Sequence, residues 1–506
     1  MLPSLPHGRA VHAVAVRSCA ASEDAFVAAA VVQMYARCGD MAGAVNAYGV
    51  LEKPDVVLLT SVVTGYEQNG LAMEAMEFFA RNVVGRGVAP TPVTLVSVIS
   101  AAAQLGDAWN GRASHAYLVR NSLGYNLALV NAVLGFYVKI GDVQAARRLF
   151  EGMADRDVVT WSSMIKGYVR SGDAHEALRV YRGMVQVGVQ PNSVTLVSIL
   201  QACALAVDVE EGKSIHHIAV NMGCELEVGV ATALVDMYMK CSCHEEAMHL
   251  FHQMPRKDVV AWGAVISGLT QNGLPDESIQ MFKCMLLDDH APDAVTMVKV
   301  LNACSGSGVA LQATCLHGYL VRSGFDNKVF VAAALLDLYS KCGNLDSAVR
   351  VFDSTTEKDV VLWSSMIAGY GAHGFGQEAV ALYQKMIGSS IKPNSVTFVS
   401  VLSACSHSGM VQEGRQIFDS MTRVYGVVPN PEHQSALVDL LGRAGELQEA
   451  IKVIQEMDGR AVAHTWCANN SEMSEVVAKN LLKLDPDHVG YCNLLTSMHL
   501  MRIGKV

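Results

Sequence analysis

The sequence predicts an all-α fold, an α-solenoid in which helix-turn-helix repeats of about 35, 35 and 31 residues stack on one another. First, three near-copies of a twelve-residue segment, beginning at Asp157, Asp258 and Asp359, recur at an interval of 101 residues. Second, apolar residues recur at steps of three and four, as on one face of a helix. Third, glycine and proline separate these stretches. Such repetition is typical of stacked structural units rather than of an active site.

Each 101-residue block divides into three similar repeats. Their boundaries fall at 158–192, 193–227 and 228–258, and again at 259–293, 294–328 and 329–359. Upstream, the same division gives 56–91, 92–126 and 127–157, with one extra residue. Downstream, 360–394 begins a further block.

The repeat 158–192 shows how each unit is expected to fold. Ile165 lies on the apolar face of a first helix, Gly172 breaks the pattern, and Tyr181 lies on the apolar face of a second helix. Gly188 can end that helix in a left-handed conformation, and Asn192 is a favoured cap for the next one. Two short helices cannot bury their apolar faces alone, so the repeats must stack.

Two aromatic series follow the repeat. The tryptophans are expected in the core: Trp161, Trp262 and Trp363. Three histidines fall on the second helix of the middle repeat: His115, His216 and His317. Their identical placement in each block indicates packing or a helix contact rather than catalysis.

Composition limits the class of protein. The chain has 506 residues, of which 51% are hydrophobic and 17% charged, so it is folded and too long for one compact core. The net charge of −10 argues against a nucleic-acid partner. Thirteen cysteines without a signal peptide fit reduced thiols. No apolar run approaches the roughly 18 residues of a membrane helix, so no membrane partner is expected.

Three motifs carry a resemblance to a known family. They are "YxKCG" in the short repeat, "VSxLxAC" in the long repeat and "DVVxWSSMIxGY" in the standard repeat. Together they resemble the pentatricopeptide repeat family of land plants, in its PLS subgroup, whose arrays form right-handed superhelices. The resemblance implies this layout: a truncated L-type repeat at 1–24, an array of P, L and S repeats at 25–458, and a partial E-type extension at 459–506.

The resemblance also implies a function. Members of the family bind single-stranded organellar RNA, one nucleotide per repeat. PLS proteins with E extensions specify cytidines for C-to-U editing, so expected partners are organellar RNA and a deaminase-bearing protein or editing accessory factors. The expected compartment is a mitochondrion or chloroplast, with the mitochondrion favoured. No transit peptide is visible in the sequence, so the compartment is inferred from the family alone.

Base choice in the family depends on the fifth and the last residue of a repeat. Asn131 with Asp157 resembles the uracil pair. The adenine pairs are Ser162 with Asn192 and Ser364 with Asn394, and the guanine pair is Thr232 with Asp258. Four pairs depart from the pattern and are expected to loosen specificity: Thr60 with Thr91, Gly263 with Asp293, Ala29 with Asp55, and Ala333 with Asp359. From residue 25 onward the array is expected to read ???UA?G???A.

Helix capping offers a competing explanation for the last residue of each repeat. Asp55, Asp157, Asp258 and Asp359 are ordinary N-cap residues, favoured at a helix start by hydrogen bonding and the macrodipole. Both interpretations remain open at these positions. The fifth position discriminates better, because Asn131 gains nothing from helix propensity.

The sequence predicts no enzyme, cofactor or metal site. A zinc deaminase needs H-x-E and P-C-x-x-C. His244 to Glu246 matches H-x-E within a repeat, but the chain contains no C-x-x-C, phosphate-binding loop or G-x-S-x-G. Cys241, Cys243 and His244 are the nearest approach to a metal cluster, and Cys241 is explained by the repeat. Any deaminase must therefore act in trans.

Two other functions remain open: a helical-repeat protein–protein scaffold, and a truncated product without activity. The net charge of −10 favours both over RNA binding. Scaffolds of the tetratricopeptide type keep a constant repeat of about 34 residues and a W-x₂-L-G-x₂-Y signature, which this chain lacks. Recurring lysines near the end of the short repeats' first helices are candidate phosphate contacts: Lys139, Lys240 and Lys341.

Overall fold

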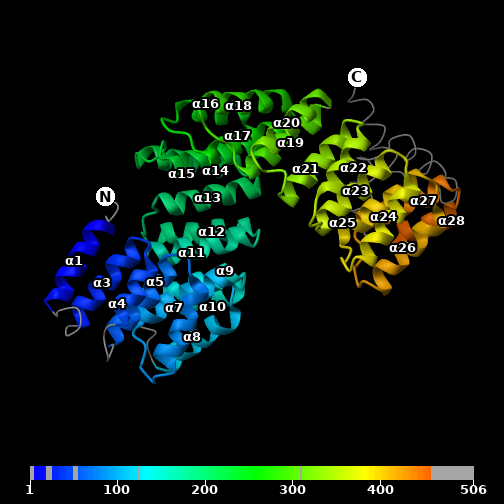
Figure 1. The fold of residues 1–506 in the computed structure, drawn as a ribbon. Helices are drawn as coiled ribbons and strands as arrows, with labels where there is room; N and C mark the ends of the chain where they lie inside the picture. The colour runs from blue at the N-terminus through cyan, green and yellow to red at the C-terminus, as the bar shows by residue number, and fades with distance from the viewer. Residues whose placement is uncertain (1–4, 19–24, 50–54, 122–125, 308–309, 457–506) are drawn as a thin grey trace. The chain divides into compact units, whose positions relative to one another are not determined.

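The structure is a computed structural model that describes residues 5–18, 25–49, 55–121, 126–307 and 310–456. Within these residues it contains helices and no strand, and antiparallel helix pairs follow one another along the chain (Figure 1). The predicted all-α fold of stacked helical hairpins is confirmed. The chain forms two compact units, Met1–Arg256 and Lys257–Val506.

The first unit contains the following helices: α1 (Leu5–Arg17), α3 (Ala25–Arg37), α4 (Met41–Tyr48), α5 (Val56–Gln68), α6 (Ala72–Phe79), the π-helix η1 (Ala80–Val84), α7 (Pro92–Leu105), α8 (Ala108–Arg120), α9 (Leu127–Ile140), α10 (Val143–Gly152), α11 (Val158–Arg170), α12 (Ala174–Gln186), α13 (Ser193–Ala206), α14 (Val209–Asn221), α15 (Val228–Lys240) and α16 (His244–Gln253).

The second unit contains the following helices: α17 (Val259–Gln271), α18 (Pro275–Leu287), α19 (Ala294–Ser307), α20 (Ala310–Arg322), α21 (Val329–Lys341), α22 (Leu345–Ser354), α23 (Val360–Ala372), α24 (Gly376–Gly388), α25 (Ser395–His407), α26 (Val411–Arg423), α27 (Pro431–Arg443) and α28 (Leu447–Glu456).

The first helix of a repeat starts where the sequence repeat starts. Helices α11, α13 and α15 begin at Val158, Ser193 and Val228, the first residues of their repeats. The side chains of Asp157 and Asn192 cap α11 and α13 by accepting hydrogen bonds from backbone N–H groups three residues on. Capping chemistry therefore sets the register of each repeat.

Within each unit the first helices form a continuous layer. Helix α11, for example, packs on its own partner α12 and on the neighbouring first helices α9 and α13, and α23 does the same with α24, α21 and α25. Each second helix packs on its own first helix and on the next one, as α12 does on α11 and α13. The first helices are therefore placed to present one face of every repeat to a common side.

The repeated tryptophans are buried, as predicted. Trp161, Trp262 and Trp363 are each 6% exposed or less. Trp161 meets the ring of Phe150 edge to face at 5.0 Å, and Trp363 meets Phe352 in the same way at 5.1 Å. In both cases the partner ring comes from the preceding short repeat. The tryptophan therefore joins successive hairpins.

The repeated histidines make a helix contact, as predicted. Each donates to or accepts from a tyrosine hydroxyl on the first helix of the next repeat, at 2.9 Å in His115–Tyr137, 2.8 Å in His216–Tyr238 and 2.9 Å in His317–Tyr339. Helix α1 makes the same contact through His12 and Tyr35 at 3.0 Å. Burial lowers the pKa of His115 and His317.

The extra residue of repeat 56–91 is absorbed by a π-helical turn. The second helix begins as α6 and continues as η1, where the N–H of Gly85 donates to the carbonyl of Ala80, five residues back, at 2.9 Å. The widened turn takes up one residue and leaves Thr91 at the N-cap of α7. The next hairpin therefore starts in register.

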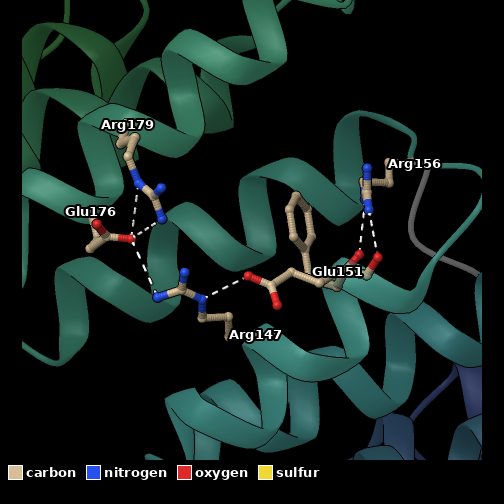
Figure 2. A network of polar contacts seen from close by, with 6 residues as sticks. Arg147, Glu151, Arg156, Glu176 and Arg179 are labelled. Atoms are coloured by element: carbon tan, nitrogen blue, oxygen red, sulfur yellow. Dashed lines mark hydrogen bonds and ion pairs between the residues drawn. The ribbon is translucent and has the colours of Figure 1, made fainter.

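Ion pairs join successive second helices on the surface of the first unit. Figure 2 shows Arg147 of α10 between Glu151 of its own helix, at 2.8 Å, and Glu176 of α12, at 3.8 Å. Arg179 pairs with Glu176 at 2.5 Å, and Arg156 donates to the backbone carbonyls of residues 150 and 151. Exposed pairs of this kind add little to stability because water and salt screen them. They link neighbouring second helices, as Arg147 and Glu176 do.

Two further predictions concern the C-terminal segment and membrane-spanning helices. The proposed E-type segment, 459–506, lies outside the described residues. Among the described helices, none is long and apolar enough to cross a membrane.

Candidate functional site

The structure brings together the fifth residue of one repeat and the last residue of the same repeat. The fifth residue lies one turn into the first helix, and the last residue is the N-cap of the next first helix. Because neighbouring first helices pack side by side, the two side chains approach each other. We call these two residues the site pair of the repeat.

The site pair of repeat 127–157 is directly hydrogen bonded. Asn131 Nδ2 donates to Asp157 Oδ1 at 3.1 Å, and Asn131 Oδ1 accepts from Thr160 Oγ1 at 2.7 Å. Asp157 Oδ1 also accepts from the backbone and hydroxyl of Thr160, at 2.9 and 2.8 Å. Burial acts to raise the pKa of Asp157, but the hydrogen bonds from Thr160 and Asn131 outweigh it and the pKa is lowered. Asp157 is therefore a carboxylate acceptor at neutral pH.

The two pairs predicted to suit adenine share one geometry. In repeat 158–192, the hydroxyl oxygens of Ser162 and Thr195 lie 2.7 Å apart, and Asn192 Oδ1 accepts from Thr195 N and Oγ1, both at 2.9 Å. In repeat 360–394, Ser364 and Thr397 lie 2.7 Å apart, and the corresponding bonds to Asn394 are 3.0 Å. Because the asparagine oxygen is used in capping, the exposed amide N–H₂ is the group presented outward.

The pair of repeat 56–91 is built from hydroxyl groups alone. Thr60 and Thr91 both contact Thr94 Oγ1, at 2.6 and 2.8 Å. Each hydroxyl both donates and accepts, so this set distinguishes bases poorly.

Thr232 belongs to the first compact unit and Asp258 to the second. Thr232 Oγ1 is buried and has no hydrogen-bond partner among the described residues. Asp258 caps α17 by accepting from the N–H of Ala261 at 2.8 Å.

The pair of repeat 259–293 has an aspartate and no fifth side chain. Asp293 Oδ1 accepts from Thr296 N at 2.7 Å, and Lys299 Nζ donates to the carbonyl oxygen of Gly263 at 3.0 Å. Burial acts to raise the pKa of Asp293, but hydrogen bonds from Thr296 and the charge of Lys299 outweigh it and the pKa is lowered. A cation thus stands beside a carboxylate at this pair.

Sequence reasoning missed a threonine that organises most site pairs. It is the third residue of the following repeat, and it contacts both members of the pair in four repeats with a polar fifth residue: Thr94 for Thr60, Thr160 for Asn131, Thr195 for Ser162 and Thr397 for Ser364. In the four capping boxes that it forms, its hydroxyl also accepts from the N-cap backbone, at 3.2–3.3 Å. The signal was present in the recurring "VT" that opens these helices.

A second missed feature is an exposed apolar residue at the second position of most repeats. Its members are 47–78% exposed: Phe26, Val57, Val93, Val159, Val194, Val260, Val295, Phe330, Val361 and Val396. The second and fifth residues lie three apart and so share one helix face. An exposed apolar side chain therefore accompanies each site pair that lies within one unit, except in repeat 127–157, where Ala128 holds the place.

The aspartates at repeat ends do cap helices. Asp55, Asp157, Asp258 and Asp359 accept from the backbone N–H three residues on at 2.8–2.9 Å. Asparagines that end long repeats cap as well, at Asn126 and Asn430. Because capping is common to all repeat types, the presence of a capping residue at the end of a repeat is not by itself evidence of base recognition.

The recurring lysines differ in their surroundings. Lys240 and Lys341 form ion pairs with Asp236 and Asp337 one turn back, at 2.8 and 2.7 Å. Lys139 has a glycine at that place and forms no ion pair among the described residues. Lys139 is therefore the best placed of the three to meet a phosphate.

The two cysteines of the candidate metal cluster, Cys241 and Cys243, make contacts within their own repeat. Cys241 Sγ lies 3.9 Å from the sulfur of Met237, and Cys243 Sγ donates to the carbonyl of residue 241 at 3.6 Å. Across the part of the chain that the structure describes, no group of three metal-ligating side chains comes together. Burial raises the pKa of Cys203 and Cys405 to about 12, so both are packed thiols.

Comparison with known proteins gives matches along most of the chain. The PPR repeat family matches residues 156–204 and 358–407. The PPR repeat matches 57–81, 129–158, 230–259, 260–290, 333–360, 396–424 and 435–462.

Two Arabidopsis thaliana relatives are pentatricopeptide repeat-containing proteins. A chloroplastic one is 36% identical over 500 residues, covering 97% of this chain and 62% of that protein. A mitochondrial one is 36% identical over 512 residues, covering 98% of this chain and 73% of that protein. The chain thus spans less than two thirds of the first relative.

Among solved structures, the chain is similar to the maize pentatricopeptide repeat protein PPR10, with a TM-score of 0.45 and 17% identity over 92% of this chain and 80% of that one. PPR10 in complex with an 18-nt psaJ RNA element gives a TM-score of 0.37 and 17% identity over 99% of this chain and 97% of that one.

Proposed function

Because the chain belongs to the pentatricopeptide repeat family, we propose that it binds single-stranded RNA in an organelle and selects bases through its site pairs. The observation that carries this proposal is the combination, on one face of the first helices, of an exposed apolar residue with a polar pair bridged by the next repeat's threonine, as in repeats 158–192 and 360–394. A scaffold for proteins has no need of a polar pair that is rebuilt in successive repeats.

The combination suits an unpaired base. An apolar side chain such as Val159 offers a surface for the face of a base, and stacking contacts of unpaired bases are worth about 1–3 kcal/mol each. The site pair offers donors and acceptors to the base edge. Double-stranded nucleic acid keeps those edges paired, so the arrangement favours single strands.

The base assignments follow from the groups that each pair presents. Asp157 can accept from the N3–H of uracil, and the Asn131 amide can donate to an adjacent carbonyl. The exposed amide of Asn192 or Asn394 can donate to the N1 acceptor of adenine. The family resemblance assigns the repeat with Thr232 as its fifth residue and Asp258 as its last to guanine, whose N1–H and N2–H suit a carboxylate. The proposed reading is ???UA?G???A.

The biological role we propose is site recognition for C-to-U RNA editing. It rests on the PLS pattern of alternating repeat lengths and on the resemblance of 480–500 to an E-type extension. The chain supplies recognition in this proposal, and a deaminase in a separate protein supplies the chemistry. The compartment is a mitochondrion or a chloroplast, since the relatives' names include both.

The net charge of −10 is the strongest observation in favour of a protein scaffold. It is not decisive, because the charge of one face can differ from the charge of the whole chain; the ion pairs between second helices, such as Arg182 with Glu211 at 2.9 Å, leave that net charge unchanged. The lysines of the short repeats' first helices are the candidate phosphate contacts, and they are few. RNA affinity should then fall with salt along a shallow slope.

Filter binding tests the proposal. The native chain is titrated against random single-stranded RNA and against duplex DNA of equal length, at several salt concentrations. We expect clear preference for single-stranded RNA, with a logarithmic salt slope of about −1 to −3, as for one to four neutralised phosphates. Equal affinity for both polymers, or no binding to either, would refute RNA recognition and favour the hypothesis of a protein scaffold.

A further inference from the structure

One lysine occupies the place of a missing fifth side chain. Lys299, the sixth residue of repeat 294–328, donates from Nζ to the carbonyl oxygen of Gly263 at 3.0 Å. A Cβ placed on Gly263 would lie 3.0 Å from that Nζ and 3.6 Å from Thr296 Oγ1. In repeats 158–192 and 360–394, the fifth side chain likewise contacts the third-position threonine of the next repeat. The ammonium group therefore stands where those repeats place a serine hydroxyl.

The lysine is specific to this repeat. The equivalent sixth residues of the other long repeats are Ser97, Ser198 and Ser400. Their hydroxyls donate to carbonyls of their own helices, at 2.9–3.3 Å, and Ser97 Oγ also lies 2.7 Å from Thr64 Oγ1 of the preceding first helix. Lys299 instead donates to the backbone carbonyl of the fifth residue of the preceding repeat. Among these four long repeats, it alone places a charged donor at the preceding site pair.

We propose that Gly263, Asp293 and Lys299 form a three-residue site that selects a base with a ring N–H beside a carbonyl, namely guanine or uracil. The inference rests on the proposed function and replaces the expectation that Gly263 loosens specificity. The Asp293 carboxylate accepts from the ring N–H, and the Lys299 ammonium, which carries three N–H groups, donates to the carbonyl. Adenine and cytosine present a ring lone pair to the carboxylate and an amino group to the ammonium, so both contacts become repulsive.

The test compares four RNA pools, 5′-NNNUANGXNNA-3′, that differ only in the base X opposite repeat 259–293. We expect the native chain to bind pools with guanine or uracil at X at least about tenfold tighter than pools with adenine or cytosine. Lys299→Ser restores the residue of the other long repeats and should reduce this ratio to nearly one. Lys299→Met, which keeps the aliphatic stem, should do the same.

The matched control is Lys283→Ser, which removes an exposed lysine from α18 of the same unit. It should leave the ratio at X unchanged. Within each protein, a further pair of pools with uracil or adenine at the fourth base gives a ratio that serves as an internal reference and depends on Asn131 and Asp157. Circular dichroism checks that each variant folds.

The outcomes separate this site from the general proposal. A native chain that prefers uracil at the fourth base but binds the four X pools equally would overturn the three-residue site alone. Equal weakening of all four pools by Lys299→Ser would also overturn it, since that is the signature of a phosphate contact. A native chain that binds no pool would overturn the proposed function and this inference with it.

Discussion

Replacing the site pair of repeat 127–157 by a hydroxyl–asparagine pair, of the same kind as in repeat 158–192, should convert a uracil site into an adenine site. The perturbation is the double substitution Asn131→Thr and Asp157→Asn. Thr160 already stands at the third position of the next repeat, as Thr195 does in the adenine pair. The double variant thus reproduces the hydroxyl–threonine–asparagine arrangement without a change elsewhere.

The structure indicates that the fold tolerates the exchange. Asparagine is about as good an N-cap as aspartate, so α11 keeps its cap with little loss. The bond from Asn131 Nδ2 to Asp157 Oδ1 is lost, which costs about 1 kcal/mol, and a threonine hydroxyl at 131 can reach Thr160 as Thr60 reaches Thr94. We expect a decrease in the free energy of unfolding of about 1 kcal/mol or less.

The change in base preference should be larger. A well-made contact to a base edge discriminates by about 1–3 kcal/mol, and both members of the pair change here. Since about 1.4 kcal/mol is a factor of ten in affinity, the ratio of uracil to adenine affinity should fall by at least about tenfold and cross one.

Competition gel shifts with RNA pools 5′-NNNXANGNNNA-3′, with uracil or adenine at X, measure this ratio. The control is Asp173→Asn, which changes an N-cap of the same chemical kind at α12, outside any site pair. It should leave the ratio unchanged. An unchanged ratio in the double variant would show that Asp157 is only a cap and would remove base recognition from this repeat.

Three further outcomes test other parts of the account. Thr195→Val removes a buried hydroxyl that contacts Ser162 and Asn192. Denaturant unfolding should show a loss of about 1 kcal/mol of stability, and gel shifts should show lower selectivity for adenine at the fifth base of the pool. Unchanged selectivity for adenine would contradict a positioning role for Thr195. Burial keeps the pKa of His115 and His317 below the ordinary 6.5, so the unfolded chain binds more protons below about pH 6.5. The two histidines should therefore not reduce the free energy of unfolding above that pH and should reduce it increasingly as the pH drops. The urea midpoint should fall less with decreasing pH when both histidines are replaced by glutamine. An identical fall of the midpoint in the variant would show that these histidines are not the cause. Deleting Val84 should convert η1 to a regular helical turn and shift thermal unfolding little, whereas deleting Val185 from the regular helix α12 should be strongly destabilising; equal effects would contradict the account of the extra residue.

The sequence alone was sufficient for features that repeat. Helix starts at Val158 and Val259 follow from the periodicity and the caps, and the burial of Trp161 follows from its recurrence in an apolar helix face. The sequence predicted that His115 makes a packing or helix contact, but it did not identify Tyr137 as the partner. The identity of the site pairs came from the family resemblance, since no spacing argument links Asn131 to Asp157.

Features that depend on packing between repeats were not predictable in this way. Lys299 and Gly263 lie 36 residues apart, and their contact depends on the distance between two neighbouring first helices. The bridging role of Thr195 likewise appears only when two hairpins are placed side by side. The π-helical turn at η1 is one of several ways to absorb an extra residue, and the sequence does not select among them.

The central claim is that successive repeats meet successive unpaired bases through their site pairs. Selection of RNA by the native chain from a fully random single-stranded pool, followed by sequencing, tests this most directly. The account predicts enrichment of U-A-x-G-x-x-x-A, with guanine or uracil directly after the G. Enrichment of an unrelated sequence, or of paired stems, would contradict it.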